Sequence, residues 1–246
     1  MMAAAAAKAE NPKAELVLIE KNPGLGTKVL ISGGGRCNVT TGFHDLRAIV
    51  DRYPRGGKFL QSAFFRFPPQ AVMDWFEAHG VPLKTEADGR VFPVSDSGKD
   101  VVGALQQELE HGGVKILLKK EVASIQKNGE KFKVTLKTGE MEEADKVILT
   151  TGGQAYRHTG STGEGYAFAE SLGHTITALA PSLNSFILKE KWTTKLAGVS
   201  LKKVQLKTKR AQKIEWTGPI LFTHRGITGP AVFAFSSLLA FETYNE

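Results

Sequence analysis

The stretch that decides the fold runs from Leu16-Val-Leu-Ile-Glu20 to Lys28-Val-Leu-Ile-Ser-Gly-Gly-Gly-Arg-Cys-Asn-Val-Thr40. A short continuous apolar run that ends in an acid is typical of a strand buried on both faces of a parallel sheet. Three consecutive glycines cost backbone entropy, so they are expected where the main chain must come very close to another group. The combination favours an α/β domain that holds a cofactor beside this strand.

Glu20 stands where a dinucleotide-binding βαβ unit places an acid, at the end of the second strand, to bind the ribose hydroxyls of adenosine. In such a unit the glycine loop that holds the pyrophosphate lies about 20 residues earlier. Counting back that far from Glu20 reaches Met1. We therefore expect the first strand and its Gly-x-Gly-x-x-Gly loop to lie before the chain begins, so that the true N-terminus is missing.

Two further glycine clusters strengthen the cofactor interpretation. Thr151-Gly-Gly153 follows an apolar run, and Thr159-Gly-Ser-Thr-Gly-Glu-Gly165 opens a predicted helix. The amides at a helix N-terminus favour an anion or the polar edge of a cofactor. Each cluster alone is compatible with a simple turn, so it is their combination with Glu20 that predicts one extended, nucleotide-like ligand.

Hydrophobic periodicity and turn residues predict the other elements. We expect an N-terminal helix that ends near Asn11-Pro12, a glycine-rich loop over 22–45, helices over 70–79, 99–111 and 163–172, a hairpin over 81–94 that turns at Asp88-Gly89, a buried strand over 114–118, and a three-stranded meander over 121–126, 131–137 and 146–150. Beyond residue 175 the pattern changes to short strands with lysines at alternate positions, followed by a helix-like run over 233–241. We place a domain boundary near Pro181.

Composition excludes several classes of protein. Of the 246 residues 41% are hydrophobic and 23% are charged, which are proportions of a folded globular chain with a sizeable core. A single cysteine allows no internal disulfide and indicates a reducing compartment, so we expect an intracellular location, cytoplasmic or organellar. No apolar run reaches membrane-spanning length, and the six histidines show no metal-ligand spacing. We expect neither a membrane partner nor a metal.

The net charge of +7 is concentrated in one segment. Between Asn184 and Ile214 there is one acid, Glu190, and there are nine basic residues: Lys189, Lys191, Lys195, Lys202, Lys203, Lys207, Lys209, Arg210 and Lys213. Such a stripe can bind nucleic acid, but lysines also protect exposed strand edges from aggregation. Because no stacking aromatic pattern accompanies these lysines, we favour a solvated strand face over a nucleic-acid partner.

Five segments together resemble one family, the BaiN/HI0933-like flavoproteins: Lys28–Thr40, Asp88–Ser95, Thr151–Gly153, Thr159–Gly165 and Gly218–Pro230. Members of this family are NAD(P)/FAD-dependent oxidoreductases. The resemblance implies an α/β fold class, with an incomplete Rossmann-like FAD-binding domain of parallel sheet, helices and β-meander over residues 1–181. The start of an inserted β-rich domain would follow over 182–246, so that the family pattern is truncated at both ends.

The resemblance also implies a cofactor site. Glu20 would bind the FAD ribose, residues 32–38 would line the flavin, and Val122 would touch the adenine through its backbone. Arg36 offers a fixed charge suited to phosphate or to a reduced flavin, and Cys37 is either a redox group or, as a lone cysteine more often is, inert packing. The implied cofactor-binding residues are Glu20, Lys21, Lys28, Ser32, Gly33, Gly34, Gly35, Arg36, Cys37, Asn38, Val122, Thr151, Gly152, Gly153, Gly163, Glu164 and Gly165.

The implied chemistry is hydride or electron transfer between a small-molecule substrate and a bound FAD, with NAD(P)H as a candidate donor. No separate nicotinamide fingerprint stands in the chain, and no catalytic residue, substrate or oligomeric state follows from the residues. Two alternatives stay open. One is a non-catalytic binding module that uses the basic stripe over 189–213. The other is an inactive truncated product. Losing the central strand of a parallel sheet leaves its neighbours unpaired, so the oxidoreductase interpretation itself predicts a fragment with impaired cofactor binding.

Overall fold

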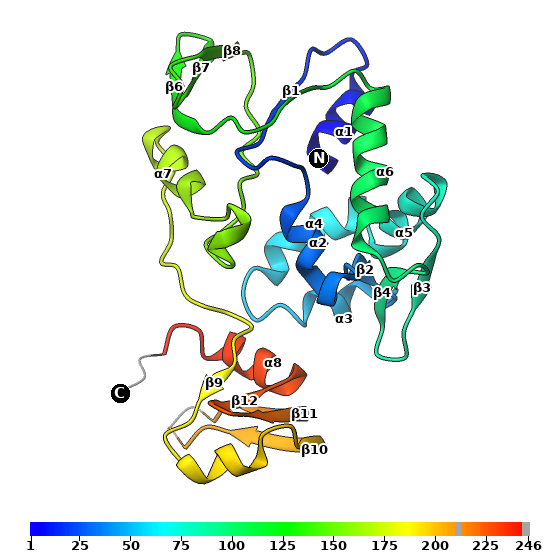
Figure 1. Ribbon diagram of the computed structural model, residues 1–246, viewed down its shortest axis with the longest axis vertical. Helices are drawn as coiled ribbons and strands as arrows, with labels where there is room; N and C mark the ends of the chain where they lie inside the picture. The colour runs from blue at the N-terminus through cyan, green and yellow to red at the C-terminus, as the bar shows by residue number, and fades with distance from the viewer. Residues whose placement is uncertain (210–212, 243–246) are drawn as a thin grey trace. The chain divides into compact units, whose positions relative to one another are not determined.

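A computed structural model describes residues 1–209 and 213–242 of the chain. Contacts divide the chain into two compact units, residues 1–176 and residues 177–246. The larger unit combines helices with short sheets, and the smaller unit is one antiparallel sheet with a helix against it (Figure 1). The α/β fold class followed by a β-rich region is therefore confirmed, whereas the division into an FAD-binding domain over 1–181 and an inserted domain over 182–246 stays a prediction.

The larger unit contains most of the predicted elements. Its helices are α1 Met2–Glu10, α2 Thr27–Ile31, α3 Leu46–Val50, α4 Gly57–Arg66, α5 Pro69–Ala78, α6 Gly98–His111 and α7 Glu164–Ser171, with 3-10 turns η1 Ser32–Gly35 and η2 Arg157–Thr159. Its strands are β1 Val17–Ile19, β2 Thr40–Thr41, β3 Leu83–Thr85, β4 Arg90–Pro93, β5 Lys115–Leu117, β6 Val122–Asn128, β7 Lys131–Leu136 and β8 Met141–Ala144. The predicted N-terminal helix, the helices predicted over 70–79, 99–111 and 163–172, and the hairpin are confirmed within one or two residues.

Helix α6 forms because its local signals agree. The Ser97 hydroxyl caps its first turn by accepting a hydrogen bond from the Lys99 amide at 3.3 Å. One face of the helix buries Val101, Leu105 and Leu109. This face packs against α1 and α2, so α6 is the central support of the larger unit.

The parallel pair β1–β5 is less buried than the sequence predicts. The register runs from Val17 opposite Lys115 to Ile19 opposite Leu117. In the described residues this sheet has two strands, and Val17 is 43% exposed. The prediction that residues 16–20 form a strand buried on both faces is therefore wrong, because no further strand of the described chain lies beside β1. The buried strand predicted over 114–118 forms as β5, but its three residues are exposed or half-buried.

Two other predictions are wrong in position. Residues 22–45 are not all loop, since α2 forms there with the Leu30 amide donating to the Gly26 carbonyl at 3.0 Å. The third meander strand is β8, at Met141–Ala144, and no strand covers 146–150. The tight turn at Gly139 returns the chain at once to pair with β7, so the polar residues before 146 take the ladder positions.

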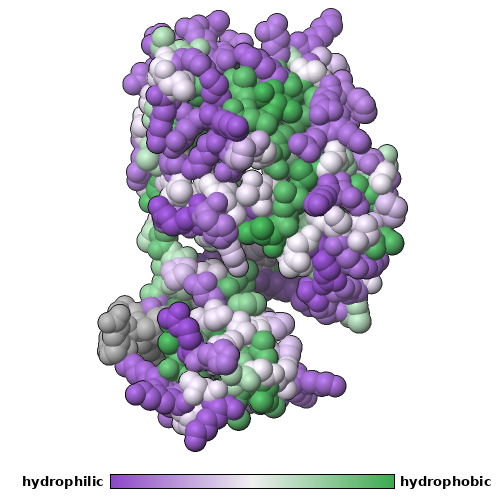
Figure 2. All heavy atoms as spheres, viewed as in Figure 1, coloured by the Kyte–Doolittle hydropathy of each residue, from purple (hydrophilic) through white to green (hydrophobic). Residues whose placement is uncertain are grey.

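Much apolar surface on the larger unit is uncovered. Figure 2 shows a continuous band of hydrophobic residues over the region where Figure 1 draws α1 and α2. Leu30 and Ile31 at the end of α2 are 37% and 43% exposed. Within residues 1–209 and 213–242, no helix is both long enough and apolar enough to cross a lipid bilayer.

The smaller unit is a four-stranded antiparallel sheet in the order β10-β11-β12-β9. Its elements are β9 Phe186–Ile187, the 3-10 turn η3 Lys191–Leu196, β10 Ser200–Lys207, β11 Glu215–Thr223, β12 Gly226–Thr228 and α8 Pro230–Leu238. Ile220, Ala231 and Val232 form its core, with α8 against the sheet. The helix predicted over 233–241 begins three residues earlier, because Pro230 suits a first helical position.

Candidate cofactor site

Lys21 joins the end of β1 to the start of α7. Its Nζ donates to the Thr162 hydroxyl at 2.9 Å and to both carboxylate oxygens of Glu164 at 2.7 and 2.8 Å. Burial alone would raise the pKa of Glu164, but the hydrogen bonds from Lys21 and Thr162 outweigh it and lower the pKa below the ordinary 4.5. Two predicted cofactor-binding residues, far apart in sequence, therefore lie in direct contact.

Two more hydrogen bonds tie the same segments together. The Asn22 side-chain amide donates to the Thr159 carbonyl at 3.0 Å, and Lys28 Nζ donates to the Ala155 carbonyl at 2.8 Å. With the Lys21 contacts, these bonds hold the segment 20–38 against the loop 151–165. The sequence singles out the cluster 159–165 for its glycines, but it does not reveal Asn22 or the contacts of Thr159 and Thr162, because the partners lie more than a hundred residues apart.

Glu20 directly follows β1. Its amide donates to the Leu117 carbonyl at 2.9 Å, and its carbonyl accepts from Lys120 at 3.1 Å, so β1 ends beside the start of β6 and Val122. Carboxylate atom Oε1 accepts from the Asn22 amide at 2.8 Å. Oε2 has no hydrogen-bond partner among the described residues. A half-buried carboxylate with a free acceptor suits a ribose hydroxyl.

Glycine is suited to the tract 33–35 for two different structural reasons. All three residues are left-handed, with φ values of 57°, 71° and 92° at Gly33, Gly34 and Gly35. A Cβ at Gly33 would lie 3.0 Å from both the Asn38 amide and the Phe92 ring, so internal packing requires that glycine. A Cβ at Gly34 would meet nothing within 4 Å. The main chain at Gly34 is thus open to the close approach of another group.

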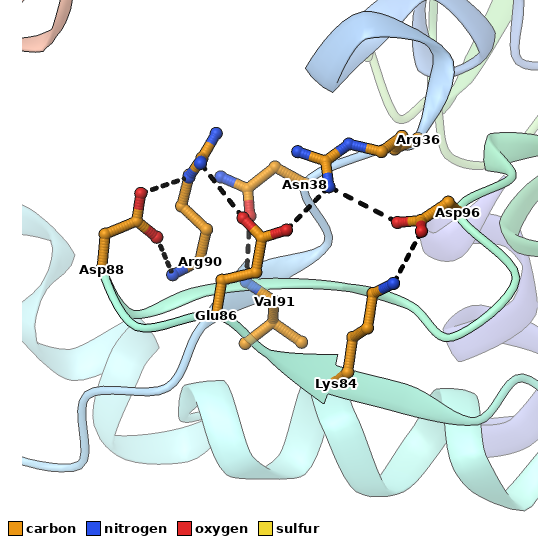
Figure 3. Close-up of polar contacts among 8 residues, drawn as sticks. All are labelled: Arg36, Asn38, Lys84, Glu86, Asp88, Arg90, Val91 and Asp96. Atoms are coloured by element: carbon orange, nitrogen blue, oxygen red, sulfur yellow. Dashed lines mark hydrogen bonds and ion pairs between the residues drawn. The ribbon is translucent and has the colours of Figure 1, made fainter.

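The Arg36 side chain binds to residues of the β3–β4 hairpin and to Asp96, which follows it. Figure 3 shows its guanidinium between two carboxylates, with NH1 donating to Glu86 at 2.7 Å and to Asp96 at 3.4 Å. The guanidinium also stacks on the Phe92 ring at 3.9 Å from the centroid. The hydrogen bond to Glu86 raises the pKa of Arg36. The suggested role of Arg36 toward phosphate or flavin stays a prediction, and it would require sharing these partners.

Asn38 and Ser32 flank a mainly apolar cavity. The side-chain oxygen Oδ1 of Asn38 accepts from the Val91 backbone amide at 3.3 Å (Figure 3), and the Ser32 hydroxyl donates to the Val29 carbonyl at 2.8 Å. The cavity has a volume of about 440 Å³. Its lining comprises Met2, Lys28, Val29, Ser32, Cys37, Asn38, Val39, Phe67, Val72, Phe76, Val101 and Leu105. Its size and its few polar groups suit part of a ring-shaped ligand.

Cys37 is a packed core residue. It is 6% exposed and packs with Phe76, Val101 and Leu105. Burial raises the pKa of its thiol above 9.0, and a hydrogen bond with Ser32 offsets only part of this effect. These surroundings favour the inert interpretation of Cys37 over a thiolate nucleophile.

We expect Cys37 to resist thiol reagents in the folded chain. At neutral pH its reaction with a dithiobenzoate reagent should be at least about 100-fold slower than in the same chain unfolded by guanidinium, because both burial and the raised pKa withhold the thiolate. The rate should still be rising as the pH passes 9.0. Rapid stoichiometric labelling of the folded chain at neutral pH would restore Cys37 as a candidate nucleophile.

In the loop 151–165, some glycines have room for a side chain and others do not. Gly152 has a φ of 74°, and a Cβ there would be 3.6 Å from the Ser161 hydroxyl, so the position has room. Gly163 caps α7 with a φ of 92°. Gly165 is buried, and a Cβ there would collide with the Thr151 hydroxyl. A Cβ at Gly153 would lie 3.3 Å from the Tyr166 hydroxyl, which is tight but not excluded.

The Lys21–Glu164 ion pair should make stability depend on pH. The pKa of Glu164 is lowered in the folded chain, so the stabilisation is fully present above pH 4.5 and is lost as the pH falls through the folded value. At neutral pH, Glu164→Gln should cost about 1 kcal/mol or less, because the pair is partly exposed. Urea unfolding at several pH values checks this, with Glu130→Gln in the exposed β6–β7 turn as the control. A difference that persisted unchanged in acid would contradict it.

The basic stripe lies on the smaller unit. Its eight described lysines (Lys189, Lys191, Lys195, Lys202, Lys203, Lys207, Lys209 and Lys213) are all exposed, while Arg210 lies outside the described residues. Lys207 pairs with Glu215 at 3.3 Å. Exposure alone fits both a solvated strand face and a binding module, so both stay predictions. Among the described residues, no three metal-binding side chains gather in one place.

The chain is similar to curated proteins that are longer than it is. It is 32% identical over 241 residues to a 3-dehydro-bile acid delta(4,6)-reductase of Clostridium scindens, covering 98% of this chain and 58% of that protein. It is 32% identical over 225 residues to a ribosomal RNA dihydrouridine synthase of Escherichia coli, covering 90% of this chain and 54% of that protein. The chain thus spans little more than half the length of these relatives.

A solved structure and a family model give the fold and the family. The open conformation of a flavocytochrome c3 fumarate reductase matches with a TM-score of 0.55 and 22% identity, over 81% of this chain and 44% of that one. At that identity the likeness supports the fold alone. The model for the HI0933-like protein Rossmann domain matches residues 1–224, which is most of the chain and includes every residue of the candidate site. This chain therefore belongs to the HI0933-like family, as the resemblance of its five segments predicted.

Proposed function

We propose that this chain carries the cofactor-binding part of an FAD-dependent oxidoreductase. One observation carries the proposal: residues 20–38 and 151–165, which the sequence assigns to one extended ligand, are held together by the side chains of Lys21, Asn22 and Lys28. Membership of a family of Rossmann domains supports the nucleotide part of the assignment. When bound, a flavin supplies hydride or electron transfer between a donor and a substrate.

Each part of the site has a proposed task. Glu20 accepts hydrogen bonds from the ribose hydroxyls through its free Oε2, and the backbone at Val122 borders the adenine. The open main chain at Gly34 admits the cofactor closely. Ser32 and Asn38 present polar groups to a mainly apolar cavity. The N-terminal amides of α7, beginning at Glu164, attract a negatively charged group.

We propose a substrate with a carbon–carbon double bond in a ring. One relative is named as a delta(4,6)-reductase of a bile acid and another as a dihydrouridine synthase of ribosomal RNA, and both names describe reduction of an unsaturated ring. NAD(P)H is the proposed source of the hydride and solvent the source of the proton. The substrate is then either a small molecule or a pyrimidine base within RNA.

The test is the visible spectrum of the purified chain before and after addition of FAD and desalting. We expect a retained flavin band, and Glu20→Gln should weaken retention by about tenfold, the value of one lost charge-assisted hydrogen bond. Glu130→Gln, on an exposed turn, is the matched control and should leave retention unchanged. A chain that stays colourless at every FAD concentration contradicts the proposal and favours an inactive product.

A further inference from the structure

The segment from α3 to the end of α4 presents an unusual surface. Two phenylalanines of α4 point into solvent, Phe59 at 85% and Phe65 at 78% exposure. Leu60 and Phe64, on the other side of the helix, are half-buried, and the Phe64 ring lies 5.7 Å from that of Tyr53. The helix thus buries one aromatic face internally and leaves a second one uncovered within the described chain.

Positive charge surrounds these two rings. At 3.6 residues per turn, Lys58, Phe59, Ser62, Phe65 and Arg66 share one exposed face of α4. Lys58 and Arg66 have no ion-pair or hydrogen-bond partner among the described residues. This set of five residues is named the α4 face.

The charge extends beyond the α4 face. Between residues 44 and 67 the chain has five cationic side chains and two acidic ones: Arg47, Arg52, Arg55, Lys58 and Arg66 against Asp45 and Asp51. All five cations are exposed. The Arg52 guanidinium stacks at 4.3 Å on the ring of Phe43, which shows that cation and aromatic groups are interleaved here.

The alternation of the exposed rings of Phe59 and Phe65 with the cations Lys58 and Arg66 fits one chemistry. Aromatic faces stack unpaired bases, and lysine and arginine neutralise the phosphates between them. An apolar protein partner would not require the cations, and a phosphate ligand would not require the rings. The one aromatic residue in the basic stripe of the smaller unit is Trp192, which is 61% exposed, whereas the α4 face has two more exposed rings on one helix. The α4 face is therefore the stronger candidate.

The α4 face also leads to the candidate cofactor site. The chain leaves α4 at Phe67, which lines the cavity that Ser32, Cys37 and Asn38 border. Phe67 thus belongs both to the end of α4 and to the cavity wall, so the α4 face and the cavity adjoin through one residue of the larger unit. That placement lets a displaced base enter the cavity while its neighbours remain stacked outside.

We infer that the α4 face binds single-stranded RNA and presents one of its bases to the cavity. Binding itself depends on Phe59, Phe65, Lys58 and Arg66, whereas the role of the bound base as substrate rests on the proposed reductase function. A second copy of this chain is the competing occupant of the exposed rings.

The test measures binding of a fluorescein-labelled oligouridylate of about 12 nucleotides to the full chain by anisotropy, over a series of salt concentrations. Phe59→Ala and Phe65→Ala should each weaken binding by about tenfold, the order expected for one lost stacking contact. The double variant Lys58→Gln/Arg66→Gln should reduce the slope of log affinity against log salt by about 1.4, or about 0.7 for each lost phosphate contact on a single strand. Lys202→Gln/Lys203→Gln, in the basic stripe, is the matched control and should bind as the parent chain does.

Several results would overturn the inference. One is loss of binding only in the control variant, which would move the RNA site to the basic stripe. Others are equal binding by all variants, no binding by the parent chain, or a dimer that the two alanine variants dissociate. Flavin retention is read separately from its absorption band: RNA binding by a colourless chain contradicts the proposed function alone, and flavin retention without RNA binding contradicts this inference alone.

Discussion

Phe92→Ala should destabilise the larger unit by about 3–5 kcal/mol, whereas Phe59→Ala should change its stability by no more than about 0.5 kcal/mol. Phe92 is fully buried on β4, and Phe59 is 85% exposed. The Phe92 ring supports the glycine tract at Gly33 and carries the Arg36 guanidinium on its face. Removing it therefore opens a cavity beneath the candidate site and withdraws the surface on which Arg36 stacks.

Urea unfolding followed by tryptophan fluorescence measures this difference in stability, provided that the fluorescence comes from the larger unit alone. Trp75 is the tryptophan of the larger unit, and Trp192 and Trp216 belong to the smaller one. Replacing the latter two by phenylalanine makes fluorescence specific to the larger unit. Equal losses for Phe92→Ala and Phe59→Ala in that background would mean that β4 is not the support of the glycine tract.

The sequence predicts the elements whose signals are local. Helix α6 has its cap, its apolar face and its closing Gly112 within one stretch, and the hairpin turn at Asp88-Gly89 stands between its own strands. The burial of β1 and the position of the third meander strand were predicted wrongly, because each depends on which strand lies alongside. A short apolar run such as 146–150 does not reveal whether a neighbour is present.

In the candidate site, too, local features could be predicted from the sequence and contacts between distant segments could not. The glycines and the acid at the strand end were visible because backbone conformation and charge at a fixed spacing leave a pattern. The contacts that join the two segments could not be predicted from the sequence, because Lys21 and Glu164 come together only in the folded chain. Arg36 is the clearest case: its charge was evident from the sequence, but its partner Glu86 lies 50 residues further along. The sequence therefore shows which side chains can form an ion pair or a hydrogen bond, but only the fold shows which partners they bind.

Gly34→Leu should weaken FAD binding by about 10- to 100-fold, the range of a tight steric intrusion. The position is left-handed and exposed, and a Cβ there would meet no protein atom within 4 Å. The side chain would therefore not displace the chain's own packing. It would occupy the space through which we propose the cofactor approaches, so the loss should appear in affinity far more than in stability.

Gly129→Leu separates that effect from backbone strain. Gly129 is in the β6–β7 turn with a φ of 60°, and a Cβ there would also meet nothing within 4 Å. Both variants carry the cost of a left-handed leucine, about 1–3 kcal/mol, so both should shift the unfolding midpoint by similar amounts. Flavin retention after desalting should fall only for Gly34→Leu. If both variants lost the flavin equally, strain alone would explain the loss, and the open backbone at Gly34 would have no part in holding the cofactor.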